Sequence, residues 1–131
     1  MTYRILVTGC RDWEDGKAVY QALTNAWCEA MKKDHNNMRA SQITIVHGNA
    51  TGADAYARIF AGKMQMFQEP FPANWQTHGK AAGPIRNQEM VNLGADICLA
   101  FWDGQSKGTA DCIAKAVRAG IPVSITPKGK P

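Results

Sequence analysis

The chain has 131 residues, of which 45% are hydrophobic, and carries a formal net charge of +4 at pH 7. This length accommodates one domain with its own core, and the composition is that of an ordinary soluble globular protein. The positive charge favours an anionic partner such as a nucleotide, a phosphate or a nucleic acid, and agrees equally well with a role in solubility alone. We find no signal peptide and no apolar run long enough to span a bilayer, so we expect a cytoplasmic protein without a membrane partner.

The cysteine pattern argues against disulfides and against a zinc site. Four cysteines, at positions 10, 28, 98 and 112, form no Cys-x-x-Cys pair, and two of them lie inside apolar runs. We therefore predict reduced, mostly buried thiols. The three histidines, His35, His47 and His78, are not spaced with the cysteines as zinc ligands, so we predict no metal and no cofactor.

Short apolar runs and helical periodicities alternate along the chain. The apolar runs predict strands at residues 4–8, at 43–46, somewhere within 65–71, at 96–102 and at 121–125. Helices are predicted between them, near residues 15–33, 53–64, 84–93 and 109–119. Residues 72–83 read as a long loop that carries Trp75, His78 and Lys80, and a loop of this length in a small domain is usually functional or mobile.

Individual residues predict where the helices begin and end. Asp15 is placed to cap the first helix, and Thr51-Gly52-Ala53-Asp54 resembles a capping box with Asp in place of Glu. Pro84 suits the first turn of the third helix, and Thr109 is expected to cap the last one. The residues expected to face inward from that last helix are Ile113, Ala114, Ala116 and Val117. Pro122 suggests that the final strand lies at a sheet edge.

Strands that alternate with helices imply right-handed βαβ units and an α/β fold with a parallel sheet. The simplest doubly wound arrangement has five strands in the order 3-2-1-4-5, flanked by about four helices. The order reverses between strands 1 and 4, and ligands of such sheets bind in the crevice at that point, formed here by the loops after strands 1, 2 and 4. We expect a single domain over residues 1–126, followed by a loose basic tail at 127–131.

Two glycine-containing loops that lead into helices are candidate anion sites, because backbone N–H groups and the helix dipole both favour an anion there. We assign the phosphate to Gly104–Thr109, after the fourth strand, and the ribose or base to Gly48–Asp54, after the second. The first of these lacks the Gly-Lys-Ser/Thr of a P-loop and the GxGxxG of a dinucleotide site, which disfavours ATP hydrolysis. An ordinary turn with a Thr cap is the alternative.

Two arginines are candidates for contact with an anion. Arg86, next to Asn87, lies near a helix start, where a cation opposes the helix dipole. This unfavourable position favours an anionic ligand over a plain surface arginine, because arginine binds phosphate bidentately or stabilises developing charge. Arg11, in the loop after the first strand, is a similar candidate beside Thr8 and Gly9.

Two carboxylates have both a structural and a functional interpretation. Asp111, in the first turn of the last helix, either stabilises that helix or acts beside a ribosyl phosphate as a general base or stabiliser of an oxocarbenium-like centre. Asp54 either caps its helix or contacts a ribose hydroxyl. The residues themselves leave both choices open.

Aromatic and histidine side chains near the loops are further candidates. Trp13, Trp75 and Trp102 are able to stack on a base, although packing at strand ends is the more usual fate of a tryptophan. His47 and His78 are candidate acid–base groups, although a lone histidine at a strand end is more often structural.

Four ordered motifs resemble one known family over nearly the whole chain. They are Val7–Trp13, His47–Asp54, the segments Phe71–Trp75 and His78-Gly79 with Ala82–Asn87, and Ala100–Gly104 with Gly108–Asp111. They resemble the YspA and cpYpsA-related proteins of the SLOG superfamily, which is named for the DNA-processing protein DprA (Smf) and the LOG phosphoribohydrolases. The resemblance implies a Rossmann-like fold that binds nucleotides or nucleotide-derived ligands, and members are common in bacteria and phages.

LOG enzymes cleave the N-glycosidic bond of a nucleoside monophosphate, which releases a free base and ribose 5-phosphate. Their signature is Pro-Gly-Gly-x-Gly-Thr followed by a Glu, with an Arg on a preceding helix. By resemblance, Gly108-Thr109 matches the end of the signature, Asp111 stands near the Glu, and Arg86 is the Arg. Gln105 and Ser106 replace the paired glycines, and the carboxylate is one methylene shorter, so the resemblance implies phosphate binding more strongly than catalysis.

The leading hypothesis is a domain that binds a nucleotide-derived ligand. If the protein is an enzyme, we expect a phosphoribohydrolase-like hydrolysis of an N-glycosidic bond, with Asp111 and Arg86 as the catalytic residues. The expected ligand contacts are Thr8, Gly9, Arg11, Trp13, Gly48, Thr51, Gly52, Asp54, Asn87, Gly104, Ser106, Lys107, Gly108 and Thr109. One alternative is DprA-like binding of single-stranded DNA, and another is a non-catalytic sensor or sequestering protein for a nucleotide signal. Related proteins commonly form dimers, so a homodimer is also expected.

Overall fold

The computed structural model of the chain describes residues 2–34 and 38–129. Its strands are β1 (Tyr3–Gly9), β2 (Ile43–His47), β3 (Phe67–Pro70), β4 (Ile97–Trp102) and β5 (Val123–Pro127). They form one parallel sheet in the order β3-β2-β1-β4-β5. The predicted α/β fold and strand order are therefore confirmed, and the order reverses between β1 and β4.

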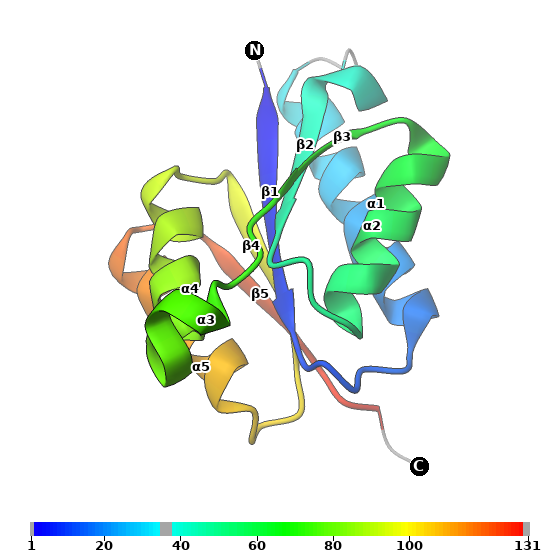
Figure 1. Cartoon of the computed structure of the whole chain (residues 1–131). Helices are drawn as coiled ribbons and strands as arrows, with labels where there is room; N and C mark the ends of the chain where they lie inside the picture. The colour runs from blue at the N-terminus through cyan, green and yellow to red at the C-terminus, as the bar shows by residue number, and fades with distance from the viewer. Residues whose placement is uncertain (1, 35–37, 130–131) are drawn as a thin grey trace.

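Helices cover both faces of the sheet. They are α1 (Gly16–Lys33), α2 (Ala53–Met64), the short α3 (Trp75–His78), α4 (Ala82–Asn92) and α5 (Lys107–Arg118). Figure 1 shows α1 and α2 on one side of the sheet and α4 and α5 on the other. Two single 3₁₀ turns, Ala40–Gln42 and Gly79–Ala81, complete the described structure. Among residues 2–34 and 38–129, no helix has the length and hydropathy needed to cross a bilayer.

The central strand β1 is buried on both faces, as expected for a parallel strand between two helical layers. Ile5 and Val7 pack into the core under α1 and α2, whereas Leu6 points to the opposite core under α4 and α5. The apolar run at residues 4–8 therefore supplies both cores, which explains why it shows no alternation of polar and apolar residues.

The expected cap at Thr109 is wrong. The helix α5 begins two residues earlier, with Ser106 at its N-cap, and Thr109 is a buried residue inside the first turn. Residues three and four apart share one face of a helix, so a single stripe of α5 is turned to the core. The buried residues of α5 are Thr109, Cys112 and Ala116, whereas the predicted inward residues Ala114 and Val117 are exposed.

The expected capping box at residues 51–54 is also wrong. Gly52 is the N-cap of α2, with a φ of 72°, and no side chain caps this helix. A Cβ at Gly52 would collide with the backbone carbonyls of Cys10 and Arg11, so glycine is needed both for the turn and for the close approach. The Thr51 hydroxyl instead donates a hydrogen bond to the Arg11 carbonyl, 2.9 Å away.

The segment expected to be a loop at residues 72–83 holds α3 and a 3₁₀ turn, and α4 begins before Pro84. Asn74 caps α3 through its side chain, a local signal that Pro72 and the glycines around it obscured. At the other end, β5 starts after Pro122, is an edge strand as predicted, and includes Pro127. The expected tail at 127–131 is described only as far as residue 129.

The cysteines are free thiols, as predicted, and three of the four are buried. Cys98 on β4 and Cys112 on α5 belong to the core under α4 and α5, and Cys10 lies at the end of β1. The exposed one is Cys28, on α1.

Replacing Asp15 with alanine should lower the free energy of unfolding by about 1 kcal/mol, because the Asp15 carboxylate accepts a hydrogen bond of 3.1 Å from the Ala18 N–H at the start of α1. Chemical denaturation measures this difference. Asp15→Asn keeps an acceptor at the N-cap and should retain most of the stability. Equal stabilities for the wild type and the alanine variant would contradict the role of Asp15 as the cap.

Candidate functional site

A cleft of about 490 Å³ opens at the carboxyl ends of the strands, where the strand order reverses. The loops after β1, β2 and β4 and the first turns of α4 line it, as the topology rule anticipates. The sequence-predicted residues that it brings together are Thr8, Gly9, Arg11, Gly48, Asp54, Arg86, Asn87, Ser106, Lys107, Gly108 and Thr109. Trp13, Thr51, Gly52, Gly104 and Asp111 are not among its lining residues.

The predicted residues outside the cleft have local structural contacts. Trp13 is buried, packs its ring against Phe101 and donates its indole N–H to the Asp15 carbonyl. Thr51 lines a smaller neighbouring hollow, and Gly104, with a φ of 83°, forms the turn after β4. These residues shape the loops around the cleft.

Arg86, on α4, lies against the end of β2. Its Nη1 donates hydrogen bonds to the carbonyls of Gly48, at 2.7 Å, and Phe71, at 3.3 Å, and its Nε donates to the Asn87 side chain. None of the described hydrogen bonds uses Nη2. Gly48 permits this packing, because a Cβ at that position would overlap the guanidinium. Burial lowers the pKa of Arg86, and the nearby Asp54 carboxylate opposes that shift.

A hydrogen-bonded chain runs from Arg86 back to α5. Asn87 accepts from Arg86 and donates through Nδ2 to Oδ2 of Asp111, 3.1 Å away. The same Asp111 oxygen accepts from Lys115 at 2.7 Å, and Lys115 also donates to the Pro84 carbonyl. Asp111 thus contacts Arg86 only through Asn87, as the last member of the series of hydrogen bonds that orients the Arg86 guanidinium.

Asp54, the second residue of α2, is 5% exposed and lines the cleft. Its Oδ2 accepts the backbone N–H groups of Gly48, at 2.9 Å, and Ala50, at 3.3 Å, so it holds the loop after β2 in shape. Its Oδ1 is buried and has no hydrogen-bond partner among the described residues. Burial raises the pKa of Asp54, and the nearby His47 ring, the Arg86 charge and the two N–H bonds oppose this rise.

The raised pKa of Asp54 makes the stability of the protein depend on pH. As the pH rises from about 4 through the raised pKa, the folded state binds more protons than the unfolded chain, so the free energy of unfolding falls. Asp54→Asn does not titrate, and wild type should therefore lose stability relative to this variant over that range. Urea denaturation at several pH values measures the difference. A constant difference would show that the Asp54 pKa is not raised.

The first turn of α5 presents free donors to the cleft. The N–H of Ala110 is the first to bond back within the helix, to Ser106, and no described hydrogen bond uses the N–H groups of residues 107–109. The Asp103 carboxylate holds the loop that leads into α5, because it accepts hydrogen bonds from the N–H groups of Gln105 and Ser106, each at 2.8 Å. These donors and the helix dipole make this end of the cleft suitable for an anion.

Positive charges predominate around the cleft. The cations on its wall are Arg11, Lys80, Arg86 and Lys107, and the acids are Asp12 and Asp54. Lys80 and Trp75 were not on the list of expected ligand contacts, although both stood out in the segment at 72–83 and Trp75 was one of three tryptophans considered for stacking on a base. Both residues could have been predicted from the sequence, because an aromatic residue and a cation lie together in a segment that follows the end of a strand.

The two candidate histidines have different surroundings. His47 is fully buried, its Nδ1 accepts the Asn49 N–H at 3.0 Å, and its Nε2 pairs with the Gln68 side chain at 3.1 Å. These two contacts hold the ring in place and give His47 a structural role. His78 is exposed at the end of α3, outside the residues that line the cleft.

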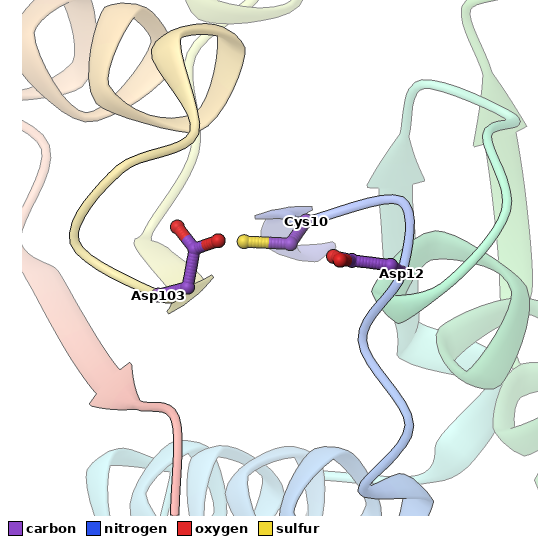
Figure 2. A group of neighbouring side chains, drawn as sticks. All are labelled: Cys10, Asp12 and Asp103. Carbon is purple, nitrogen blue, oxygen red and sulfur yellow. The ribbon is translucent and has the colours of Figure 1, made fainter.

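Cys10, Asp12 and Asp103 bring ligand-type atoms within 4.8 Å of one another (Figure 2). Figure 2 shows the Cys10 sulfur directed at the Asp103 carboxylate. Burial raises the pKa of the Cys10 thiol, which disfavours the thiolate that a metal requires, and Asp103 already accepts two backbone N–H groups. The three side chains come from the loops after β1 and β4, which lie side by side here. His35, considered with the cysteines above, lies outside the described residues.

Comparison with known proteins identifies the family. The family model described as "YspA, cpYpsA-related SLOG family" matches residues 3–78, which is more than half of the chain. The chain belongs to this SLOG family. The Gene 61 protein of Mycobacterium phage D29 is 42% identical over 127 residues, which cover 92% of this chain and 93% of that protein.

A solved structure gives a weaker match. The C-terminal domain of a hydrogenase from Pyrococcus furiosus aligns with 96% of this SLOG chain and 94% of its own length, at 14% identity and a TM-score of 0.38.

Proposed function

We propose that this SLOG protein binds a nucleoside phosphate in the cleft. The observation that carries the proposal is that two kinds of hydrogen-bonding group without partners lie in the same cleft. Backbone donors at the start of α5 have no partner among the described residues, and neither does the buried Oδ1 of Asp54. The first feature suits an anion, and the second suits a hydroxyl donor. A sugar phosphate carries both groups.

The phosphate is assigned to the N–H groups of residues 107–109. Arg86, whose Nη2 makes none of the described hydrogen bonds, and the exposed side chains of Lys107 and Lys80 line the same cleft. Charge-assisted hydrogen bonds to backbone N–H and guanidinium groups are the usual means of holding a phosphate.

The sugar is assigned to Asp54. A buried carboxylate oxygen without a partner is costly, and a ribose hydroxyl would satisfy it. The two N–H bonds to Oδ2 fix the carboxylate so that Oδ1 remains for the ligand.

Binding is better supported than hydrolysis. The carboxylate expected to assist cleavage, Asp111, is held by Lys115 and Asn87 and does not line the cleft. Its position suits orientation of Arg86 through Asn87 more than attack on an anomeric centre. The nucleotide-related family and the basic cleft are consistent with a protein that senses or sequesters its ligand.

A pair of glycine substitutions tests the phosphate assignment by calorimetry with adenosine monophosphate. A Cβ at Gly108 or at Gly62 meets no described atom within 4 Å, so neither alanine disturbs the protein itself. Of these two glycines, Gly108 lines the cleft and Gly62 does not. Gly108→Ala should weaken binding by about 10-fold by crowding the phosphate, and Gly62→Ala should bind like wild type and gain about 0.5–1 kcal/mol of stability.

No binding of adenosine monophosphate or ribose 5-phosphate to wild type would overturn the proposal. Chromatography of the same mixtures tests for turnover, and we expect no release of free base. Base release that Asp111→Asn abolishes would instead establish the phosphoribohydrolase-like reaction.

A further inference from the structure

Trp75 differs from the other tryptophans of the chain in both exposure and hydrogen bonding. The indole N–H groups of Trp13, Trp27 and Trp102 each donate to a backbone carbonyl at 2.9–3.0 Å. That of Trp75 takes part in none of the described hydrogen bonds, and the residue is 48% exposed. A half-exposed indole that lines a polar cleft, with its N–H outside the described hydrogen bonds, is able to contact a ligand.

The position of Trp75 places its ring at the mouth of the cleft. It lies on α3 and lines both the cleft and the adjoining hollow of about 250 Å³, which also borders Gly48 and Arg86. The Arg11 guanidinium, from the loop after β1, lies over the ring with its Cζ 5.2 Å from the centroid. One face of the ring is thus already used by a planar group from another loop of the cleft.

We propose that Trp75 is the stacking platform for the aromatic base of the bound nucleotide, and that the base takes the place of Arg11 on the ring. This inference rests on the proposed function, since it assumes that the phosphate and sugar occupy the cleft. A planar base is able to stack on the same face of the indole ring as a guanidinium does. Arg11, exposed and on the wall of the cleft, is then released toward the phosphate.

The consequence is a preference for nucleotides over sugar phosphates. Ribose 5-phosphate keeps the phosphate and sugar contacts but has no base to displace Arg11. Stacking on an aromatic side chain contributes about 1–3 kcal/mol per base, so Trp75→Ala should weaken the binding of adenosine monophosphate by roughly 5- to 150-fold. The same variant should bind ribose 5-phosphate at least as well as wild type does, because Arg11 is no longer held on the ring.

Calorimetry and tryptophan fluorescence together test this inference. Adenosine monophosphate should quench the fluorescence of wild type and of Trp27→Phe, in which Trp27 lies away from the cleft. The quenching should be lost in Trp75→Phe, which retains an aromatic face and should bind within a few-fold of wild type.

Four outcomes would overturn the inference. Equal losses of nucleotide and sugar-phosphate affinity in Trp75→Ala would mean that the ring only shapes the cleft. Unchanged nucleotide affinity in that variant would overturn the inference and leave the proposed function standing. Quenching by oligonucleotides but not by adenosine monophosphate would indicate a single-stranded nucleic acid instead. Absence of any binding by wild type would overturn the proposed function as well.

Discussion

Replacing Arg86 with lysine should weaken the binding of adenosine monophosphate by about 10- to 150-fold, because charge-assisted hydrogen bonds contribute about 1.5–3 kcal/mol. Lysine keeps the charge but cannot reproduce the fork that reaches the Gly48 and Phe71 carbonyls through Nη1 and leaves Nη2 for a ligand. Isothermal titration calorimetry measures the loss.

The control is Arg118→Lys. Arg118 is exposed in the last turn of α5, on the same side of the sheet as α4, and this variant should bind adenosine monophosphate as wild type does. Arg86→Lys should also be less stable by about 1–2 kcal/mol, because it leaves two carbonyls at the ends of β2 and β3 without a donor. Binding equal to that of wild type would show that the guanidinium is only a structural link between these strand ends.

Replacing Gly48 with alanine should lower the affinity for adenosine monophosphate by at least about 10-fold and the free energy of unfolding by about 1–3 kcal/mol. The added methyl group would occupy the position of the Arg86 Nη1, and it would lie 3.1 Å from Oδ2 of Asp54. Gly48 does not have a positive φ, so the cause is steric overlap and not backbone strain.

A double-mutant cycle isolates this overlap. In an Arg86→Ala background the space beside Gly48 is empty, and Gly48→Ala should then cost much less stability than it does in wild type. Additive losses of stability would show that the alanine disturbs the loop after β2 by another route, such as the hydrogen bonds to Asp54.

Local patterns were sufficient for most of the fold. The apolar runs and the helical periodicities predicted the five strands, the strand order and the crevice between the loops after β1, β2 and β4. Asp15 was correctly predicted as a cap, because its acceptor contacts an N–H only three residues away. The capping box at 51–54 failed because Asp54 instead bonds to residues on the far side of the turn.

The interactions in the cleft were less predictable than its location. The pair Asp111–Lys115 has i,i+4 spacing and could have been read from the sequence, which would have suggested that Asp111 is engaged within its own helix. The contact between Arg86 and Gly48 spans 38 residues, and no spacing rule predicts it. Trp75 could not be distinguished from Trp13 by sequence, since both lie between polar residues a few positions after a strand ends.

The sequence by itself determined the order of the elements, because hydrophobic period and loop composition are local properties of the chain. It also determined the family, through motifs that lie at the strand ends. Only the tertiary structure decided which polar groups in the cleft are satisfied. Arg86 and Asp54 meet across Gly48 because the parallel sheet brings α4 against the end of β2, and burial there leaves one oxygen of Asp54 without a partner.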